Sequence, residues 1–281
     1  MIGWALLAVA LSAIGPPVDA EGAKRRPIGK IRTGQSTVSI PAVQGAIGTA
    51  TATCPTGTKA VSGGFSTSPV PNELSVISSK RSGRRAWTAS VQQTTNNAAL
   101  AELTTFVYCD RRLRRAPVAS APLSIPSGLP QTATASCPLG RRAISGGFEI
   151  ATDITFTGAG TVLASRRSQP GEWSVTLQNI NGPSTELTAY AYCTRRPGRL
   201  REREGAATLP DSGSPITTAT AITASCPKRI GARSGGFSIA ATGGGNNYSV
   251  FESRRAGRRW RFSVRNFGQP PTPLTALAYC S

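Results

Sequence analysis

Apolar and polar residues alternate in the segments that close each third of the chain. In LTAYAYC, residues 187–193, one face of an extended strand carries Leu, Ala, Ala and Cys, and the other carries Thr, Tyr and Tyr. Residues 274–280 repeat the pattern, with Leu, Ala, Ala and Cys opposite Thr, Leu and Tyr. Because both faces are largely apolar, the pattern predicts a central strand with small residues beside the cysteine.

The rest of the chain also has the pattern of strands. Thr, Val, Ser and aromatic residues dominate, and Gly and Pro interrupt them about every eight to twelve residues. No window with a helical period is longer than about ten residues. We therefore predict an all-β protein.

Most of the chain after residue 35 is one unit written three times. The phrases TCPTGTKAVSGGF (53–65), SCPLGRRAISGGF (136–148) and SCPKRIGARSGGF (225–237) are each followed by a Ser-Lys/Arg-Arg segment, a Trp and an LT…YC segment. This repetition predicts three tandem antiparallel β modules, sandwich- or barrel-like, joined by basic linkers, each folding around its own core. The alternative is one pseudo-threefold β-prism.

The repeats and the segments between them predict the domain boundaries. An apolar run at 4–14 precedes Val18-Asp19-Ala20, which is typical of a signal peptide over residues 1–20, with an N-terminal strand or disordered leader as the alternative. The run is too short to be a transmembrane anchor. We expect a basic arm at 21–35, modules at 36–110, 117–194 and 205–281, and basic linkers at 111–116 and 195–204. The expected location is secreted or cell-surface.

The six cysteines agree with export. Six cysteines allow 15 pairings, but the repetition makes one pairing the simplest, with one bridge inside each repeat. In the loop-entropy model, a bridge closing about 55 residues stabilises the fold by roughly 4 kcal/mol. A zinc site is disfavoured because the chain has neither Cys-x-x-Cys nor His. The predicted disulfides are Cys54–Cys109, Cys137–Cys193 and Cys226–Cys280.

The missing histidine and the large positive charge limit the possible functions of the chain. The chain has no histidine, which excludes Ser-His-Asp and Cys-His catalysis and His metal ligands. Its net charge is +19, which favours anionic partners. The excess of arginine has two explanations at this point, codon usage in a GC-rich genome or recognition of phosphate and other oxyanions.

Two further phrases recur in every repeat. The glycine pair before each Phe is typical of a bulge or of a close passage of backbone past a neighbouring strand, rather than of a phosphate loop. The Ser-Lys/Arg-Arg to Trp segment predicts a hairpin in which the second basic residue covers the Trp face. Alternatively, Ser, Arg and Trp form a shallow site for a sugar or phosphate, with residues Ser79, Arg81, Trp87, Ser165, Arg167, Trp173, Ser253, Arg255 and Trp260.

The connectors supply the remaining candidate residues. They are either flexible linkers or patches for anionic polymers and cell-envelope glycans, and in the first connector the candidates are Arg111, Arg112, Arg114 and Arg115. No carboxylate recurs in all three repeats, so we expect no enzyme, no cofactor and no metal. Two alternatives to a binding protein remain. One is a purely structural envelope protein, and the weaker one is a hydrolase built from Glu149, Asp153 and Glu172. We expect a monomer.

The order of these motifs, Cys-Pro-x-Gly, Gly-Gly-Phe, Ser-x-Arg, Trp and Leu-Thr-x-Tyr-Ala-x-Cys, resembles a small cysteine-paired β module that recurs in exported actinobacterial proteins of no assigned function. The resemblance covers all three units and implies no catalytic residues. Here Arg stands where that module has Pro after the Ser, and a third consecutive Gly is missing. The CP-G and GGF phrases are also similar to those of vitelline membrane outer layer proteins, whose β-prism closes three sheets about one axis.

Overall fold

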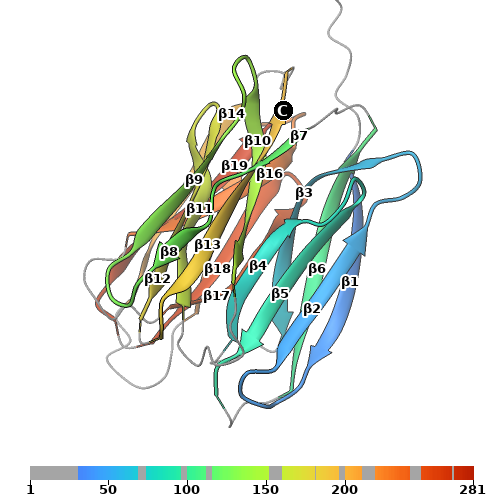
Figure 1. Cartoon of the computed structure of the whole chain (residues 1–281). Coiled ribbons are helices and arrows are strands. Elements are labelled where there is room, and N and C mark those ends of the chain that lie inside the picture. The colour runs from blue at the N-terminus through green and yellow to red at the C-terminus, as the bar shows by residue number, and fades with distance from the viewer. Residues whose placement is uncertain are drawn as a thin grey trace, which may run out of the picture.

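The computed structural model of the chain describes residues 31–68, 74–95, 100–111, 116–151, 160–180, 182–195, 200–210, 219–240, 248–267 and 269–281. All regular structure in these residues is β-strand, which confirms the predicted fold class (Figure 1). The first repeat contains β1 (Arg32–Ile40), β2 (Ile47–Thr53), β3 (Lys59–Ser68), β4 (Leu74–Arg81), β5 (Ala86–Gln93) and β6 (Ala101–Asp110). The second contains β7 (Ala116–Ala119), β8 (Leu123–Ile125), β9 (Gln131–Ser136), β10 (Arg142–Ile150), β11 (Gly160–Gln169), β12 (Glu172–Asn179) and β13 (Thr185–Thr194). The third contains β14 (Arg201–Leu209), β15 (Ala219–Ser225), β16 (Ala232–Ile239), β17 (Tyr248–Ala256), β18 (Arg259–Asn266) and β19 (Thr272–Cys280).

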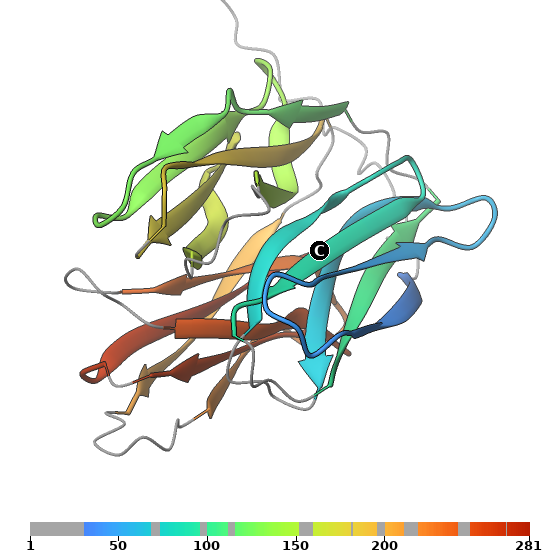
Figure 2. The same cartoon turned by 60° about the horizontal axis from the view of Figure 1, so that its bottom comes forward.

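Each repeat forms a lobe of two layers. In the first repeat, β1, β6 and β3 make one layer and β2, β5 and β4 make the other. The layers contact each other between β1 and β2, β2 and β6, and β3 and β5. The other repeats follow the same plan. In the second repeat, however, β7 and β8 together replace the single first strand, and both pair with β13. Figure 2 shows the three lobes, in blue to green, green to yellow, and orange to red.

The three sheets, however, do not belong to single repeats. Each sheet joins one layer of one lobe to one layer of another, in the orders β1-β6-β3-β17-β18-β15, β2-β5-β4-β10-β13-β7 and β14-β19-β16-β11-β12-β9. Every repeat therefore shares a sheet with both of the others, and the arrangement closes cyclically. Of the two architectures considered, the sheet orders follow the pseudo-threefold, prism-like one, while each disulfide closes within its own repeat.

The seams between lobes are where the repeated phrases meet. Across the seam of the first and second repeats, Phe148 of SGGF pairs with Ser79 of the Ser-Lys-Arg segment. The same pairing joins Phe237 to Ser165 and Phe65 to Ser253. Each seam is also crossed by a serine hydroxyl that donates to a backbone carbonyl of another repeat; these bonds are Ser145 to Val61 (2.6 Å), Ser62 to Arg233 (2.5 Å) and Ser234 to Ile144.

The glycine pairs allow this close approach. A Cβ added at Gly146 would lie 2.1 Å from Cγ of Trp173, in the same repeat. A Cβ at Gly147 would lie 2.4 Å from the carbonyl oxygen of Ser79, on the neighbouring lobe. The first glycine therefore admits the indole ring and the second admits the next strand, which confirms the predicted passage of backbone past a neighbouring strand. The equivalent pairs, Gly63-Gly64 and Gly235-Gly236, have the same surroundings.

The predicted disulfides are confirmed. Each one lies inside a lobe and links the two layers at one end, with Cα–Cα distances of 5.8, 5.7 and 5.6 Å for Cys54–Cys109, Cys137–Cys193 and Cys226–Cys280. The strand that contains each second cysteine lies inside its sheet, as its two apolar faces predicted: β6, β13 and β19 each have neighbours on both sides.

The expected segment boundaries need correction. Residues 32–35 of the expected N-terminal arm belong to β1, and residue 116 of the first linker belongs to β7. Arg201–Glu204, expected in the second linker, form the start of β14 and pair with β19, because they continue the edge strand of the third lobe. The expected signal peptide lies outside the described residues. Within the described ranges, the chain has no helix with the length and hydropathy needed to cross a membrane.

Candidate functional site

The recurring Ser and Trp form buried pairs. Ser79 on β4 pairs with Ala89 on β5, two residues from Trp87, and the Trp87 indole N–H donates to the Ser79 hydroxyl oxygen over 3.1 Å. Only 2% of the Trp87 surface is exposed. Ser165 with Trp173 and Ser253 with Trp260 repeat this bond at the same distance. A shallow surface site of Ser, Arg and Trp is therefore not formed, because the Trp ring fills the space left by the first glycine of SGGF.

The hairpin arginines cover a different aromatic ring from the one expected. The Arg81 guanidinium carbon lies 5.0 Å from the ring centroid of Tyr192, and that of Arg167 lies 4.8 Å from Tyr279. Each tyrosine comes from the next repeat and also contacts the Trp edge-on; Trp87 and Tyr192, for example, have centroids 5.4 Å apart. The prediction that Arg covers the Trp face is wrong. The Trp side chain points inward, and the Tyr of the neighbouring lobe lies beneath the Arg.

Hydroxyls of these tyrosines complete the seams. The Tyr192 hydroxyl accepts the backbone N–H of Arg81 at 2.6 Å, and Tyr108 and Tyr279 accept those of Arg255 and Arg167 at 2.7 and 2.8 Å. Burial raises the pKa of all three tyrosines. Burial also lowers the pKa of Arg81 and Arg255, the latter being half-buried. The sequence carried a signal for these tyrosines, since a Tyr precedes the second Cys in every repeat.

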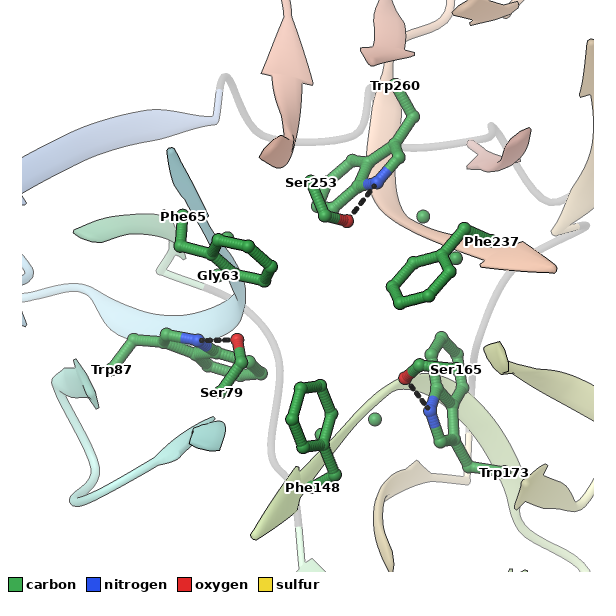
Figure 3. Close-up of a pocket in the computed structure, with 15 residues that line it drawn as sticks. Gly63, Phe65, Ser79, Trp87, Phe148, Ser165, Trp173, Phe237, Ser253 and Trp260 are labelled. Carbon is green, nitrogen blue, oxygen red and sulfur yellow. Dashed lines mark hydrogen bonds between the residues drawn. The ribbon is translucent and has the colours of Figure 1, made fainter. Parts of the chain in front are cut away.

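A small cavity lies among the three repeats (Figure 3). The Phe rings of the three SGGF phrases point into it and alternate with the three Ser–Trp pairs, as Figure 3 shows. Its volume is ≈ 30 Å³, which is room for about two water molecules. Its lining consists of the Gly-Gly-Phe, Ser and Trp positions of all three repeats, so the cavity is a consequence of packing identical units around one centre.

Positive charge gathers at one end of the molecule, which we call the basic end. It holds the three Cys-Pro turns, the three Ser-Arg-Arg hairpin turns and the ends of β6, β13 and β19, and it is the end at which the C-terminus lies in Figure 1. Among the described residues, Arg265 alone of the lysines and arginines lies near the opposite end. The exposed basic residues of the basic end are Arg32, Arg84, Arg85, Arg111, Arg142, Arg166, Arg195, Arg201, Arg203, Lys228, Arg229, Arg258, Arg259 and Arg261.

The candidate connector is anchored at this end. Arg111 directly follows β6 and is exposed. Arg112, Arg114 and Arg115 lie outside the described residues. The chain resumes at β7, which starts opposite Cys193 and therefore also at the basic end.

The structure describes two of the three scattered carboxylates, and these lie on strands of different sheets. Glu149 lies on β10, where it forms an ion pair with Lys80 at 2.5 Å and accepts the Tyr190 hydroxyl at 2.9 Å. Although burial acts in the opposite direction, these two partners hold the pKa of Glu149 below its ordinary value. Glu172 lies on β12, in another sheet, and Asp153 lies outside the described residues. No group of His, Cys, Asp or Glu that could hold a metal occurs in the described part of the chain.

One buried ion pair was not visible in the sequence. Arg233 of the third repeat donates to the carboxylate of Asp110 in the first, and both side chains are almost fully buried. Val61 and Ile144 occupy the position of Arg233 in the other repeats. The only signal was a charge at one place where the repeats are otherwise apolar.

Comparison with known proteins adds no assignment. No protein-family model matches the chain, and no curated protein matches it. The three disulfides and the three-sheet fold fit a repeat of cysteine-paired β units.

Proposed function

We propose that this protein is a non-enzymatic binding protein that attaches to anionic polymers or glycans through its basic end. The observation that carries the proposal is the distribution of charge: turns from all three repeats place exposed Arg and Lys at the same end of one body. Grouped charge of one sign raises the local concentration of an anionic partner and speeds its association. Several weak contacts on one rigid body also add to each other.

The carboxylates at the basic end leave much of this charge uncompensated. Asp110 is buried against Arg233, Glu202 is bound by Arg167, and Glu252 is bound by Arg254 and Arg261. By contrast, the exposed side chains of Arg84, Arg142 and Arg258, one on each lobe, form no ion pair with any carboxylate that the structure describes. Arginine is suited to such a surface because its planar fork binds phosphate and carboxylate groups in pairs of hydrogen bonds.

Disulfides indicate an oxidising compartment. Within the proposal, that compartment is the cell exterior, and the protein is secreted or held at the cell surface. The expected leader at residues 1–20 and the resemblance to modules of exported proteins both favour this location. The anionic partner is then a polymer or glycan of the cell envelope.

The test is the salt dependence of binding to a DNA duplex, used as a polyanion of known charge density. We expect the full chain to bind at low salt, with log affinity falling linearly against log salt. R84S/R142S/R258S removes three contacts, so the slope should become shallower by between about 2 and 3. The thermal transition should change little, because exposed substitutions usually cost less than about 0.5 kcal/mol each.

The matched control changes the same net charge at the opposite end. V43E/L100E/L129E places three carboxylates at exposed positions there and should leave the slope unchanged. Equal effects of the two variants would show that net charge alone governs binding and would contradict a site at the basic end. No binding at low salt would leave a purely structural role as the better account.

A further inference from the structure

Leu139 is an exposed apolar residue among the cations of the basic end. It lies in the Cys-Pro-Leu-Gly turn of the second repeat and is fully exposed. Arg141 N–H donates to the Pro138 carbonyl over 3.0 Å, and Gly140 takes a positive φ of 74°, so the turn is tight. The disulfide of Cys137 holds the base of the turn. A leucine is thus presented at the tip of a tight turn, and no described residue covers it.

The surroundings of this leucine are cationic. Arg142 follows the turn and is exposed, and Arg166 is exposed on the hairpin strand of the same lobe. The equivalent turn of the third repeat carries Lys228 and Arg229, both exposed. Because the three Cys-Pro turns project from the same end of a pseudo-threefold body, a flat partner can meet the leucine and these cations together.

A soluble polyanion would use the cations but would gain nothing from an exposed leucine. An anionic lipid bilayer uses both, because its headgroups attract Lys and Arg while the region below them takes up apolar side chains. We propose that the basic end docks on an anionic lipid surface, with Leu139 entering the boundary between headgroups and acyl chains. This inference rests on the proposed function and names the surface to which the basic end binds.

The first experiment measures co-sedimentation of the full chain with vesicles of phosphatidylcholine alone or mixed with phosphatidylglycerol. We expect binding to the mixed vesicles only. L139S should weaken that binding about tenfold and leave binding to the DNA duplex unchanged. Leu129, 70% exposed at the opposite end, supplies the control, since L129S should alter neither. R84S/R142S/R258S should weaken both.

The second experiment locates the side chain. In W4F/L139W, which lacks the fourth tryptophan of the chain, lipids with brominated acyl chains should quench the new tryptophan, whereas Trp87, Trp173 and Trp260 are buried and should not respond. Unchanged vesicle affinity in L139S, or an unquenched W4F/L139W, would overturn the lipid inference while duplex binding kept the proposed function. If the unaltered protein bound neither vesicles nor duplex, both the lipid inference and the proposed function would be overturned.

Discussion

At the scale of single residues, the buried pair of Arg233 and Asp110 breaks the symmetry of the repeats. It joins the third repeat to the first, which is the seam that closes the ring. The equivalent seams have Ile144 and Val61 at the Arg233 position, and Thr194 takes the place of Asp110 in the second repeat. A buried ion pair seldom adds net stability, but either charge left alone in the interior is costly.

This difference gives a prediction for a double-mutant cycle. R233I and D110T should each lower the free energy of unfolding by about 3 to 5 kcal/mol, because each removes one member of a buried ion pair and leaves the other charge in the interior. The double variant, which copies the second repeat, should recover most of that loss. Urea denaturation of the four proteins measures the coupling. A double variant as unstable as the two losses added together would show that the pair does not act as a unit.

At the scale of elements, the last strand of each repeat fixes the neighbouring lobe. The hydroxyls of Tyr108, Tyr192 and Tyr279 accept backbone N–H groups from the hairpins of other repeats. Alternation on the strand predicted that both faces are buried. It did not indicate what the tyrosine face would meet, because its partner lies more than 100 residues away along the chain.

The same tyrosines predict alkaline instability. Their pKa values are raised above 10.0 in the folded state by burial, so the unfolded chain loses these protons first as pH rises. Stability is therefore fully present below about pH 10 and should fall above it, by about 1.4 kcal/mol per pH unit for each tyrosine. Urea midpoints measured across this range test the slope.

The control for this prediction replaces all three tyrosines. Y108F/Y192F/Y279F should be less stable at neutral pH, since three backbone N–H groups lose their acceptors. Its stability should nevertheless depend less on pH above 10. An unchanged slope in the triple variant would assign the alkaline loss to other groups, such as Tyr190, whose pKa is raised to about 12 by burial and by its bond to Glu149.

At the scale of the whole molecule, cyclic sharing of sheets makes the three repeats one folding unit. An isolated second repeat would expose β10 and β11, which are paired to other repeats in the full chain. Its Ser145 and Tyr192 hydroxyls would also lose their partners. A repeat therefore completes its own disulfide and lobe core, but not its sheets.

We therefore expect the three repeats to unfold together, whereas separate modules would unfold independently. The full chain should unfold in one cooperative thermal transition, and a fragment of residues 117–194 with its disulfide intact should have no cooperative transition as a monomer. Circular dichroism melts combined with sedimentation velocity test both statements. A cooperative monomeric fragment would restore the model of independent modules.

Much of this architecture follows from the sequence because it depends on local chemistry repeated three times. Alternation predicted strands, the paired spacing of cysteines predicted the bridges, and the glycine pairs predicted a close backbone passage. These features were predictable because the residues that signal each one lie within a single repeat, although the strand that the second glycine passes belongs to another repeat. Charge composition likewise predicted anionic partners, but not the end of the molecule on which the charges gather.

The tertiary structure decided how the units combine. Sheets closed within one repeat and sheets exchanged among three use the same strands and the same alternation, so no local pattern distinguishes them. The choice depends on contacts such as Phe148 with Ser79 and Phe65 with Ser253, which form only when the three lobes surround one centre. That closure turned Ser and Trp inward and left the arginine-bearing turns together at one end, because all three repeats then point the same way.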